Sequence, residues 1–244
     1  MKKILVTYNM FREGFAELES KYDVTFPSGE KDFTYDEVMD RIHEYDVLCP
    51  MFDFPVNKEL MDKGEKLQLI ANYAVGYNNI DVAYALEKGL TVANTPGPTT
   101  DPTANIALAL LLDTARRVTE CDCNLRASGA NMKVGVLENL GMRVTGATLG
   151  IIGMGRIGKA LCKRARACGM DVIYHNRRQL DLNEETKTGA VYVTMDELLE
   201  QSDFVSVNAP YSSDTHHIID KEALKKMKCT AILINTSRGP LVVE

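Results

Sequence analysis

The sequence predicts an α/β protein that contains two parallel β-sheets. Short apolar segments alternate with segments of helical periodicity along all 244 residues. Strands that alternate with helices in this way form parallel sheets covered on both faces. A proline-rich stretch at 94–102 interrupts the alternation and divides the chain. A glycine-rich turn, Gly153-x-Gly-x-x-Gly158, lies between a strand and a helix of the second part.

The first part, residues 1–98, is predicted to form a flavodoxin-like domain. Its apolar segments are short, which is typical of buried parallel strands. Thr34-x-x-Glu37 is a capping box and predicts the start of a helix. The predicted strands are 2–8, 23–26, 47–50, 67–73 and 90–93. The predicted helices are 11–21, 34–45, 57–62 and 81–88.

Residues 99–145 are predicted to form a helix and an arm. The helix runs from Ala104 to about Thr119, and its segment Ile106–Leu112 is apolar on nearly every face. Such a helix is buried on all sides, either within the chain or against a second subunit. The stretch 121–143 is polar and irregular, and we expect an extended arm.

The glycine turn has the spacing of a dinucleotide-binding fingerprint. The apolar run 148–152 precedes it, and 156–168 follows with helical periodicity. Gly153 allows the tight turn, Gly155 lets the backbone approach a pyrophosphate, and Gly158 lets the helix pack on the strand. The helix N-terminus adds N–H groups and the positive end of the helix dipole.

Residues 99–244 are therefore predicted to form a doubly wound Rossmann domain that binds a dinucleotide and lacks its last strand or strands. The predicted strands are 148–152, 171–175, 190–193, 203–208 and 231–235. The predicted helices after the fingerprint are 156–168, 197–200 and 222–227.

The strand after the fingerprint ends at Asn176-Arg177-Arg178. Enzymes that prefer NAD usually place an acidic residue here, which binds the ribose 2′-hydroxyl and repels a 2′-phosphate. Asn176 is uncharged, and Arg177 and Arg178 can pair with a phosphate. The sequence therefore favours NADP over NAD. The alternative is a solvated arginine pair on a surface loop, with NAD as the cofactor.

Arg238 directly follows the last predicted strand, in a tight Ser-Arg-Gly turn. It is therefore expected at the carboxyl edge of a parallel sheet, where open α/β sheets bind ligands. A guanidinium there suits a small carboxylate or a carbonyl oxygen. The alternative is an ordinary salt bridge in a loop.

Composition excludes several classes of partner. The net charge of −6 argues against nucleic acid and anionic membranes, and no apolar run approaches a membrane span. The six cysteines lack a metal-binding spacing, so reduced thiols in a cytoplasmic protein are expected. His216 and His217 are adjacent, and adjacent side chains face different ways on a helix or a strand, so one metal ion is not expected to bind both. A pair of histidines in a loop after Thr215 is expected instead.

Three blocks of sequence, in this order and spacing, are typical of one enzyme family. They are 72–81 with 89–97, 149–158, and 202–239. In these blocks the chain resembles the D-isomer-specific 2-hydroxyacid dehydrogenases, and most of all the glyoxylate and hydroxypyruvate reductases. The resemblance covers nearly the whole chain. It implies hydride transfer between NAD(P)H and C2 of a small 2-oxo acid, which gives a D-2-hydroxy acid.

The resemblance also implies roles for individual residues. The backbone N–H groups of Val75 and Gly76 would hold the substrate carboxylate, and Arg238 would be catalytic, pairing with the substrate and polarising its carbonyl. The long helix and the arm would form a homodimer interface. The expected cofactor-binding residues are Thr103, Gly153, Gly155, Arg156, Ile157, Gly158, Asn176, Arg177, Arg178, Ala209, Pro210, Thr215 and Thr236.

The family's acid–base pair is expected beyond Glu244. A histidine of the family protonates the new alkoxide, and a glutamate keeps that histidine protonated. By the family's spacing, both would follow the last residue of this sequence. We therefore expect a reductase whose sequence is truncated and whose 244 residues catalyse weakly or not at all. The alternative is a catalytically deficient, dinucleotide-binding pseudoenzyme or interaction protein.

Overall fold

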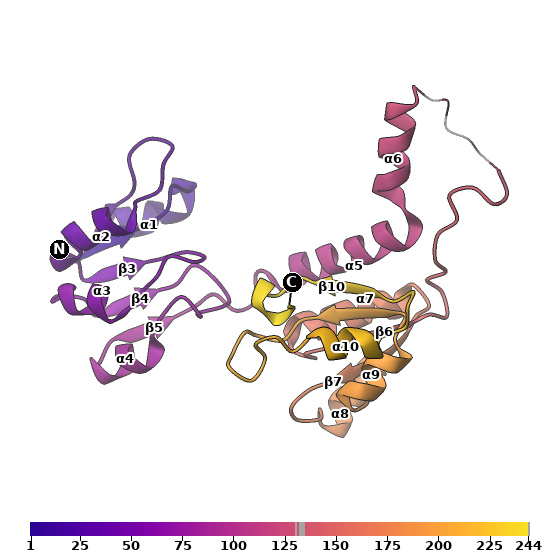
Figure 1. The fold of residues 1–244 in the computed structure, drawn as a ribbon. Helices are drawn as coiled ribbons and strands as arrows, with labels where there is room; N and C mark the ends of the chain where they lie inside the picture. The colour runs from indigo at the N-terminus through magenta and orange to yellow at the C-terminus, as the bar shows by residue number, and fades with distance from the viewer. Residues whose placement is uncertain (130, 132–134, 244) are drawn as a thin grey trace. The chain divides into compact units, whose positions relative to one another are not determined.

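The computed structural model describes residues 1–129, 131 and 135–243. The chain divides into two compact units, Met1–Gly97 and Pro98–Glu244, and each is built on one five-stranded sheet (Figure 1). Both units have the α/β architecture that the alternation of segments predicts. Within the described ranges, no helix is both long enough and apolar enough to cross a membrane.

The sheet of the first unit has the strand order β2-β1-β3-β4-β5, and every neighbouring pair is parallel. This is the order of flavodoxin-like folds, so the fold predicted for this part is confirmed. The centres of three strands, Leu5, Leu48 and Ile70, are fully buried. The strands are β1 (Lys3–Val6), β2 (Asp23–Thr25), β3 (Val47–Cys49), β4 (Leu69–Ala71) and β5 (Thr91–Ala93).

The helices of the first unit cover the two faces of its sheet unequally. Helices α2 (Tyr35–Arg41), α3 (Lys58–Lys63) and α4 (Val82–Glu87) contribute side chains to the core on one face, together with the 3₁₀ segment η2 (Ile42–Glu44). The predicted capping box opens α2: Thr34 accepts the N–H of Glu37, and Glu37 accepts the N–H of Thr34. The single helix predicted over 11–21 is instead η1 (Arg12–Phe15) followed by α1 (Ala16–Glu19). Neither segment buries a residue, so packing does not extend them.

The sheet of the second unit has the strand order β10-β9-β6-β7-β8, and all of its pairs are parallel. This is the Rossmann order, which confirms the predicted doubly wound fold. The order of the strands reverses between β6 and β9, and ligands bind at the carboxyl ends of the strands at such a switch point. The strands are β6 (Thr148–Ile152), β7 (Asp171–His175), β8 (Val191–Tyr192), β9 (Phe204–Val207) and β10 (Ile232–Asn235).

Helices cover both faces of the second sheet. Helices α5 (Thr100–Arg116) and α7 (Arg156–Ala167) share one core with Tyr174 of β7. Helices α9 (Met195–Gln201) and α10 (Lys221–Lys226) share the opposite core with Ile173, the preceding residue of β7. Neighbouring residues of a strand point to opposite faces, so β7 is buried on both sides. The last element is the 3₁₀ segment η3 (Gly239–Leu241).

Two helices of the second unit differ from the prediction. The helix predicted to end near Thr119 ends at Arg116, because Arg117 adopts a left-handed conformation with φ +57°. The stretch predicted to be irregular then begins inside a second helix, α6 (Val118–Ala127), while residues 130 and 132–134 of the predicted arm lie outside the described residues. Helix α8 (Leu182–Thr188) was not predicted. Neither α6 nor α8 buries a residue, so neither has an apolar periodicity that would reveal it.

Candidate functional site

The glycine turn, residues 153–158, joins β6 to α7 at the carboxyl edge of the second sheet. Gly153 has φ +97°, and a Cβ atom there would lie 2.6 Å from the backbone nitrogen of Ala209. A Cβ atom on Gly158 would lie 2.4 Å from the carbonyl oxygen of Gly153. A side chain at either position would therefore force the neighbouring backbone to shift. A Cβ atom on Gly155 would meet nothing within 4 Å, so this glycine borders open space.

Helix α7 begins beside this open space without a side-chain cap. Gly155 is its N-cap residue, and no side chain there accepts a hydrogen bond from the first turn. Arg156 and Ile157 are the first two residues of the helix. Uncapped N–H groups and the positive end of the helix dipole suit a phosphate group. The structure thus brings the five expected residues of the glycine turn together at one uncapped helix N-terminus.

The loop after β9 packs directly against the glycine turn. The N–H of Asn208 donates to the carbonyl of Ile152 at 2.8 Å, which sets Ala209 against Gly153. Thr215 closes this loop, because its Oγ1 donates to the carbonyl of Pro210 at 2.7 Å. Ala209, Pro210 and Thr215 therefore belong to one loop at the switch point, and the hydroxyl of Thr215 holds the loop's own backbone.

The loop after β10 carries Thr236 and Arg238. The Asn235 amide fixes its shape: Nδ2 donates to the carbonyl of Arg238 at 2.7 Å, and Oδ1 accepts the N–H of Ser237 at 3.0 Å. Ser237 Oγ donates to the carbonyl of Ala209. The loops after β9 and β10 are thereby joined. Arg238 is half-buried, and its Nη1 donates to the carbonyl of Ser237 at 2.9 Å.

Two buried oxygens mark the same edge. Within the described ranges, Asn208 Oδ1 and Thr236 Oγ1 are buried side-chain atoms without a hydrogen-bond partner. An unpaired buried polar atom destabilises the fold, so a bound group with polar atoms would be stabilising here. A carboxamide, such as that of nicotinamide, supplies both donors and an acceptor. Together with the open space at Gly155, these atoms fit a nicotinamide dinucleotide.

Asn208 was not among the residues expected from the sequence, although a polar side chain directly after a buried strand is the signal that would have found it. Thr103 was expected at the cofactor site. It is half-buried in the first turn of α5, and this helix packs against α7 and β10.

Residues 176–180, here called the arginine loop, follow β7 and touch the glycine turn. The N–H of Met154 donates to Asn176 Oδ1 at 2.6 Å. Arg177 and Arg178 are exposed, and Arg177 Nη1 lies 3.6 Å from a carboxylate oxygen of Asp214. Asp214 was not expected from the sequence and belongs to the loop after β9. The arginine loop thus offers two exposed cations beside the position that suits a phosphate.

In the first unit, Val75 and Gly76 lie in the loop after β4. Asn94 Nδ2 donates to the carbonyl of Val75 at 2.8 Å, and Asn72 Nδ2 donates to the carbonyl of Gly76 at 2.8 Å. Asn72 is 1% exposed and in turn accepts from Asn79 Nδ2 at 3.4 Å. These amides hold the two carbonyls in place. Among the described residues, neither the Val75 N–H nor the Gly76 N–H donates to a protein acceptor.

His216 and His217 lie in a turn after β9, and their ring centroids are 3.7 Å apart. The pair therefore lies in a loop after Thr215, as expected, and its two rings are stacked. The two rings can meet because the pair lies in neither a helix nor a strand, and His217 has φ +55°. In the part of the chain that the structure describes, no group of three or more His, Cys, Asp or Glu side chains could hold a metal ion.

Comparisons with known proteins identify one family. Residues 108–244 match the family described as D-isomer specific 2-hydroxyacid dehydrogenase, NAD binding domain. The chain is 43% identical to a glyoxylate reductase from Thermococcus litoralis, over 98% of this chain and 73% of the relative. It is 39% identical to a glyoxylate reductase from Korarchaeum cryptofilum, over 98% and 72%. The crystal structure of a glyoxylate reductase from Paecilomyes thermophila superposes with a TM-score of 0.87 at 32% identity, and the match covers 99% of this chain and 75% of that one.

Proposed function

The chain belongs to the D-isomer-specific 2-hydroxyacid dehydrogenase family, and from this premise we propose that it is an NADP-dependent reductase of a small 2-oxo acid such as glyoxylate or hydroxypyruvate. Members of this family transfer a hydride between NAD(P)H and C2 of a 2-oxo acid, and the bound nicotinamide supplies the hydride. The names of the two archaeal relatives support the substrate class.

The proposed preference for NADP depends on the end of β7. Asn176 is uncharged and directs its Oδ1 to the N–H of Met154, so the end of β7 itself carries no carboxylate that would repel a 2′-phosphate. The carboxylate of Asp214, from the loop after β9, lies 3.6 Å from Arg177 Nη1, and a 2′-phosphate would compete with it for this guanidinium. Arg177 and Arg178 are exposed beside it. Guanidinium groups form charge-assisted hydrogen bonds with phosphate, which are stronger than those between neutral groups. This arrangement is the observation on which the cofactor proposal rests.

The remaining cofactor contacts follow from the same edge of the sheet. The pyrophosphate would lie on the backbone of the glycine turn, where α7 has an uncapped N-terminus. The nicotinamide end would lie near the two unpaired oxygens after β9 and β10. The residues assigned to the cofactor are Thr103, Gly153, Gly155, Arg156, Ile157, Gly158, Asn176, Arg177, Arg178, Ala209, Pro210, Thr215 and Thr236.

The substrate contacts are proposed for both units. The N–H groups of Val75 and Gly76 suit a carboxylate, because the carbonyls of both residues are already held by asparagine side chains. Arg238 would pair with the 2-oxo acid and stabilise the negative charge that develops on its carbonyl oxygen during reduction. Its half-buried position strengthens that attraction relative to a fully solvated arginine.

We also propose a homodimer that uses the exposed side of α5. Ala104, Ala107, Leu111 and Ala115 are buried within the unit, as expected for an apolar helix. On its other side, Ile106 is 58% exposed and Leu110 is 44% exposed. Contiguous exposed apolar side chains are typical of protein interfaces. Further exposed apolar residues follow in α6 and after it, namely Val118, Leu125, Val136, Leu137 and Leu140.

The cofactor proposal is tested by calorimetric titration of the 244-residue chain with NADPH and with NADH. We expect NADPH to bind at least about tenfold more tightly, which is the scale of one charge-assisted contact. Arg177→Ala and Arg178→Ala should weaken NADPH binding and leave NADH binding unchanged. Arg126→Ala, which removes an exposed arginine from α6, is the matched control. Equal affinities in the unaltered chain would refute the preference for NADP.

The substrate proposal is tested by titrating glyoxylate and hydroxypyruvate into the NADP-loaded chain. Arg238→Gln should weaken binding by at least about tenfold, because it removes a charge-assisted pair. Arg126→Gln again serves as the control. Binding that survives unchanged in Arg238→Gln would show that this arginine does not contact the 2-oxo acid.

A further inference from the structure

The arginine loop is held at both ends by hydrogen bonds. At its start, the Tyr192 hydroxyl donates to the carbonyl of Asn176 at 3.3 Å, and Asn176 Oδ1 accepts the N–H of Met154. At its end, the N–H of Leu180 donates to the hydroxyl of Tyr174 at 3.0 Å. Between these two ends lie the exposed side chains of Arg177 and Arg178. The backbone of the loop is therefore fixed, whereas its two cations reach into solvent.

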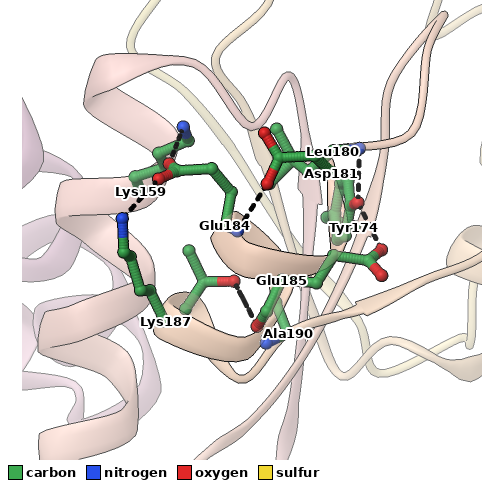
Figure 2. Close-up of polar contacts among 9 residues, drawn as sticks. Lys159, Tyr174, Leu180, Asp181, Glu184, Glu185, Lys187 and Ala190 are labelled. Atoms are coloured by element: carbon green, nitrogen blue, oxygen red, sulfur yellow. Dashed lines mark hydrogen bonds and ion pairs between the residues drawn. The ribbon is translucent and has the colours of Figure 1, made fainter.

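Tyr174 lies at the centre of the second attachment, as Figure 2 shows. Its side chain is fully buried in β7, and its hydroxyl donates to Glu185 Oε1 at 2.7 Å. The same carboxylate oxygen accepts Nε2 of Gln179, a residue of the arginine loop, at 2.9 Å. The phenol of Tyr174 and the carboxylate of Glu185 thus accept hydrogen bonds from two groups of the loop, the Leu180 N–H and the Gln179 amide.

Helix α8, which carries Glu185, is itself anchored. Asp181 caps the helix by accepting the N–H of Glu184 at 2.8 Å, and Glu184 forms an ion pair with Lys159 of α7 (Figure 2). The arginine loop is therefore tied, through Tyr174 and Glu185, to a helix that is fastened to the helix of the glycine turn. This chain of contacts links the backbone that carries the two arginines to the helix N-terminus that suits the pyrophosphate.

The hydroxyl of Tyr174 is not needed for packing, because phenylalanine would fill the same apolar volume. Burial and the hydrogen bond to Glu185 raise the pKa of Tyr174 to about 12, so the phenol stays protonated at every usual assay pH. A buried hydroxyl needs partners, and here they are the Leu180 N–H at the end of the arginine loop and Glu185, which also accepts from Gln179 of that loop. The effect of this hydroxyl is therefore on the loop and not on the filling of the core.

We propose that Tyr174 and Glu185 are positioning residues for cofactor choice: they hold the arginine loop so that Arg177 and Arg178 meet the 2′-phosphate of NADP. A long side chain loses conformational freedom when it binds, and a preorganised backbone reduces that loss. The phosphate-binding arginines would benefit, whereas the ribose of NAD has no phosphate to meet. This inference rests on the proposed use of NADP.

The test is Tyr174→Phe in the full chain, titrated with NADPH and with NADH. We expect the Kd for NADPH to rise about fivefold, the scale of one lost hydrogen bond, and the Kd for NADH to change by less than about twofold. Amide hydrogen exchange at Leu180 should become faster, because its acceptor is gone. Glu185→Ala should behave in the same way, whereas Glu185→Gln, which keeps an acceptor oxygen, should retain the ratio of the unaltered chain.

Tyr45→Phe is the matched control, since Tyr45 is a buried tyrosine of the first unit whose hydroxyl donates to Thr25 at 3.0 Å. An unchanged ratio of the two Kd values in Tyr174→Phe, or an equal loss for NADPH and NADH, would overturn the inference. In those cases the unaltered chain still prefers NADPH, so the proposed function stands. If the unaltered chain binds both cofactors equally, the preference for NADP and this inference fall together.

Discussion

Alanine should have different effects at two glycines of the same turn: it should lower the stability of the fold at Gly158 and weaken NADPH binding at Gly155. Gly158→Ala places a Cβ atom 2.4 Å from the carbonyl oxygen of Gly153 and 3.2 Å from a side-chain carbon of Ile151. The first of these neighbours is backbone, so the helix must move away from the turn. Gly155→Ala places its Cβ atom where nothing lies within 4 Å, at a residue whose φ of −79° suits alanine.

The expected magnitudes separate folding from binding. Overpacking of this kind costs about 1–3 kcal/mol, and alanine returns up to about 1 kcal/mol through its helix propensity. Because the clashing oxygen of Gly153 belongs to the backbone, the cost lies in the upper part of this range, about 2–3 kcal/mol. Gly158→Ala should therefore lose about 1–2 kcal/mol of unfolding free energy on balance, which lowers the Tm by several degrees. Gly155→Ala should change stability by less than about 1 kcal/mol, because only the cap is altered. Its methyl group occupies the space proposed for the pyrophosphate, so NADPH binding should fall by at least about tenfold.

Thermal denaturation and calorimetric titration with NADPH check the pair. Gly14→Ala is the control, since a Cβ atom there also meets nothing within 4 Å and Gly14 lies in the first unit. Full NADPH affinity in Gly155→Ala would show that the pyrophosphate binds elsewhere. Unaltered stability in Gly158→Ala would show that the close approach of helix and turn is not what requires glycine.

Three further results are expected. Asp203 accepts hydrogen bonds from the N–H of Thr148 and from the Lys228 ammonium, each at 2.8 Å. Burial raises the pKa of Asp203, but these two contacts outweigh burial and hold that pKa below its usual value. The ionised carboxylate therefore stabilises the fold at pH values above its unfolded pKa, and this contribution is lost as the pH falls through the folded pKa. In urea unfolding, Asp203→Asn should be about 1 kcal/mol less stable than the unaltered chain at pH 7, and this difference in unfolding free energy should be smaller near pH 3. Asn176→Asp keeps an acceptor for the N–H of Met154 but adds a negative charge. Calorimetric titration should therefore show that NADPH binds about tenfold more weakly and that NADH binding is not weakened. Unchanged NADPH affinity would contradict this expectation. Ile106→Glu with Leu110→Glu should sediment as a monomer, whereas Leu86→Glu, an exposed leucine of the first unit, should sediment as a dimer.

Helices that lie on the surface were the hardest elements to predict. Helices α6 and α8 bury no residue, so their sequences carry no apolar stripe, and only polar capping signals remain. In α8 that signal is Asp181, which accepts the N–H of Glu184. In α6 the first turn is held by a residue of the preceding helix α5: Asp113 accepts hydrogen bonds from the N–H and the hydroxyl of Thr119. A cap of this kind depends on the reversal at Arg117, and no local residue pattern specifies it.

Residue spacing alone, without the family resemblance, predicts a part of the candidate site only where one segment is sufficient. The glycine turn is such a case, because its spacing specifies the backbone and the helix that follows. The asparagine frame around Val75 and Gly76 is different. Asn72, Asn79 and Asn94 come from separate positions of the first unit, and their partners are backbone carbonyls that only the folded chain brings near.

The sequence by itself determined the fold class, the dinucleotide fingerprint and the family, because each depends on local spacing and on the alternation of apolar segments. Only the tertiary structure decided which side chains meet at the edge of the second sheet. The strand order β10-β9-β6-β7-β8 sets Ala209 against Gly153 and places the unpaired oxygens of Asn208 and Thr236 directly after two neighbouring strands. It likewise lets the buried hydroxyl of Tyr174 hold the arginine loop. Hydrogen bonds act over about 3 Å, so these contacts exist only after the strands are paired.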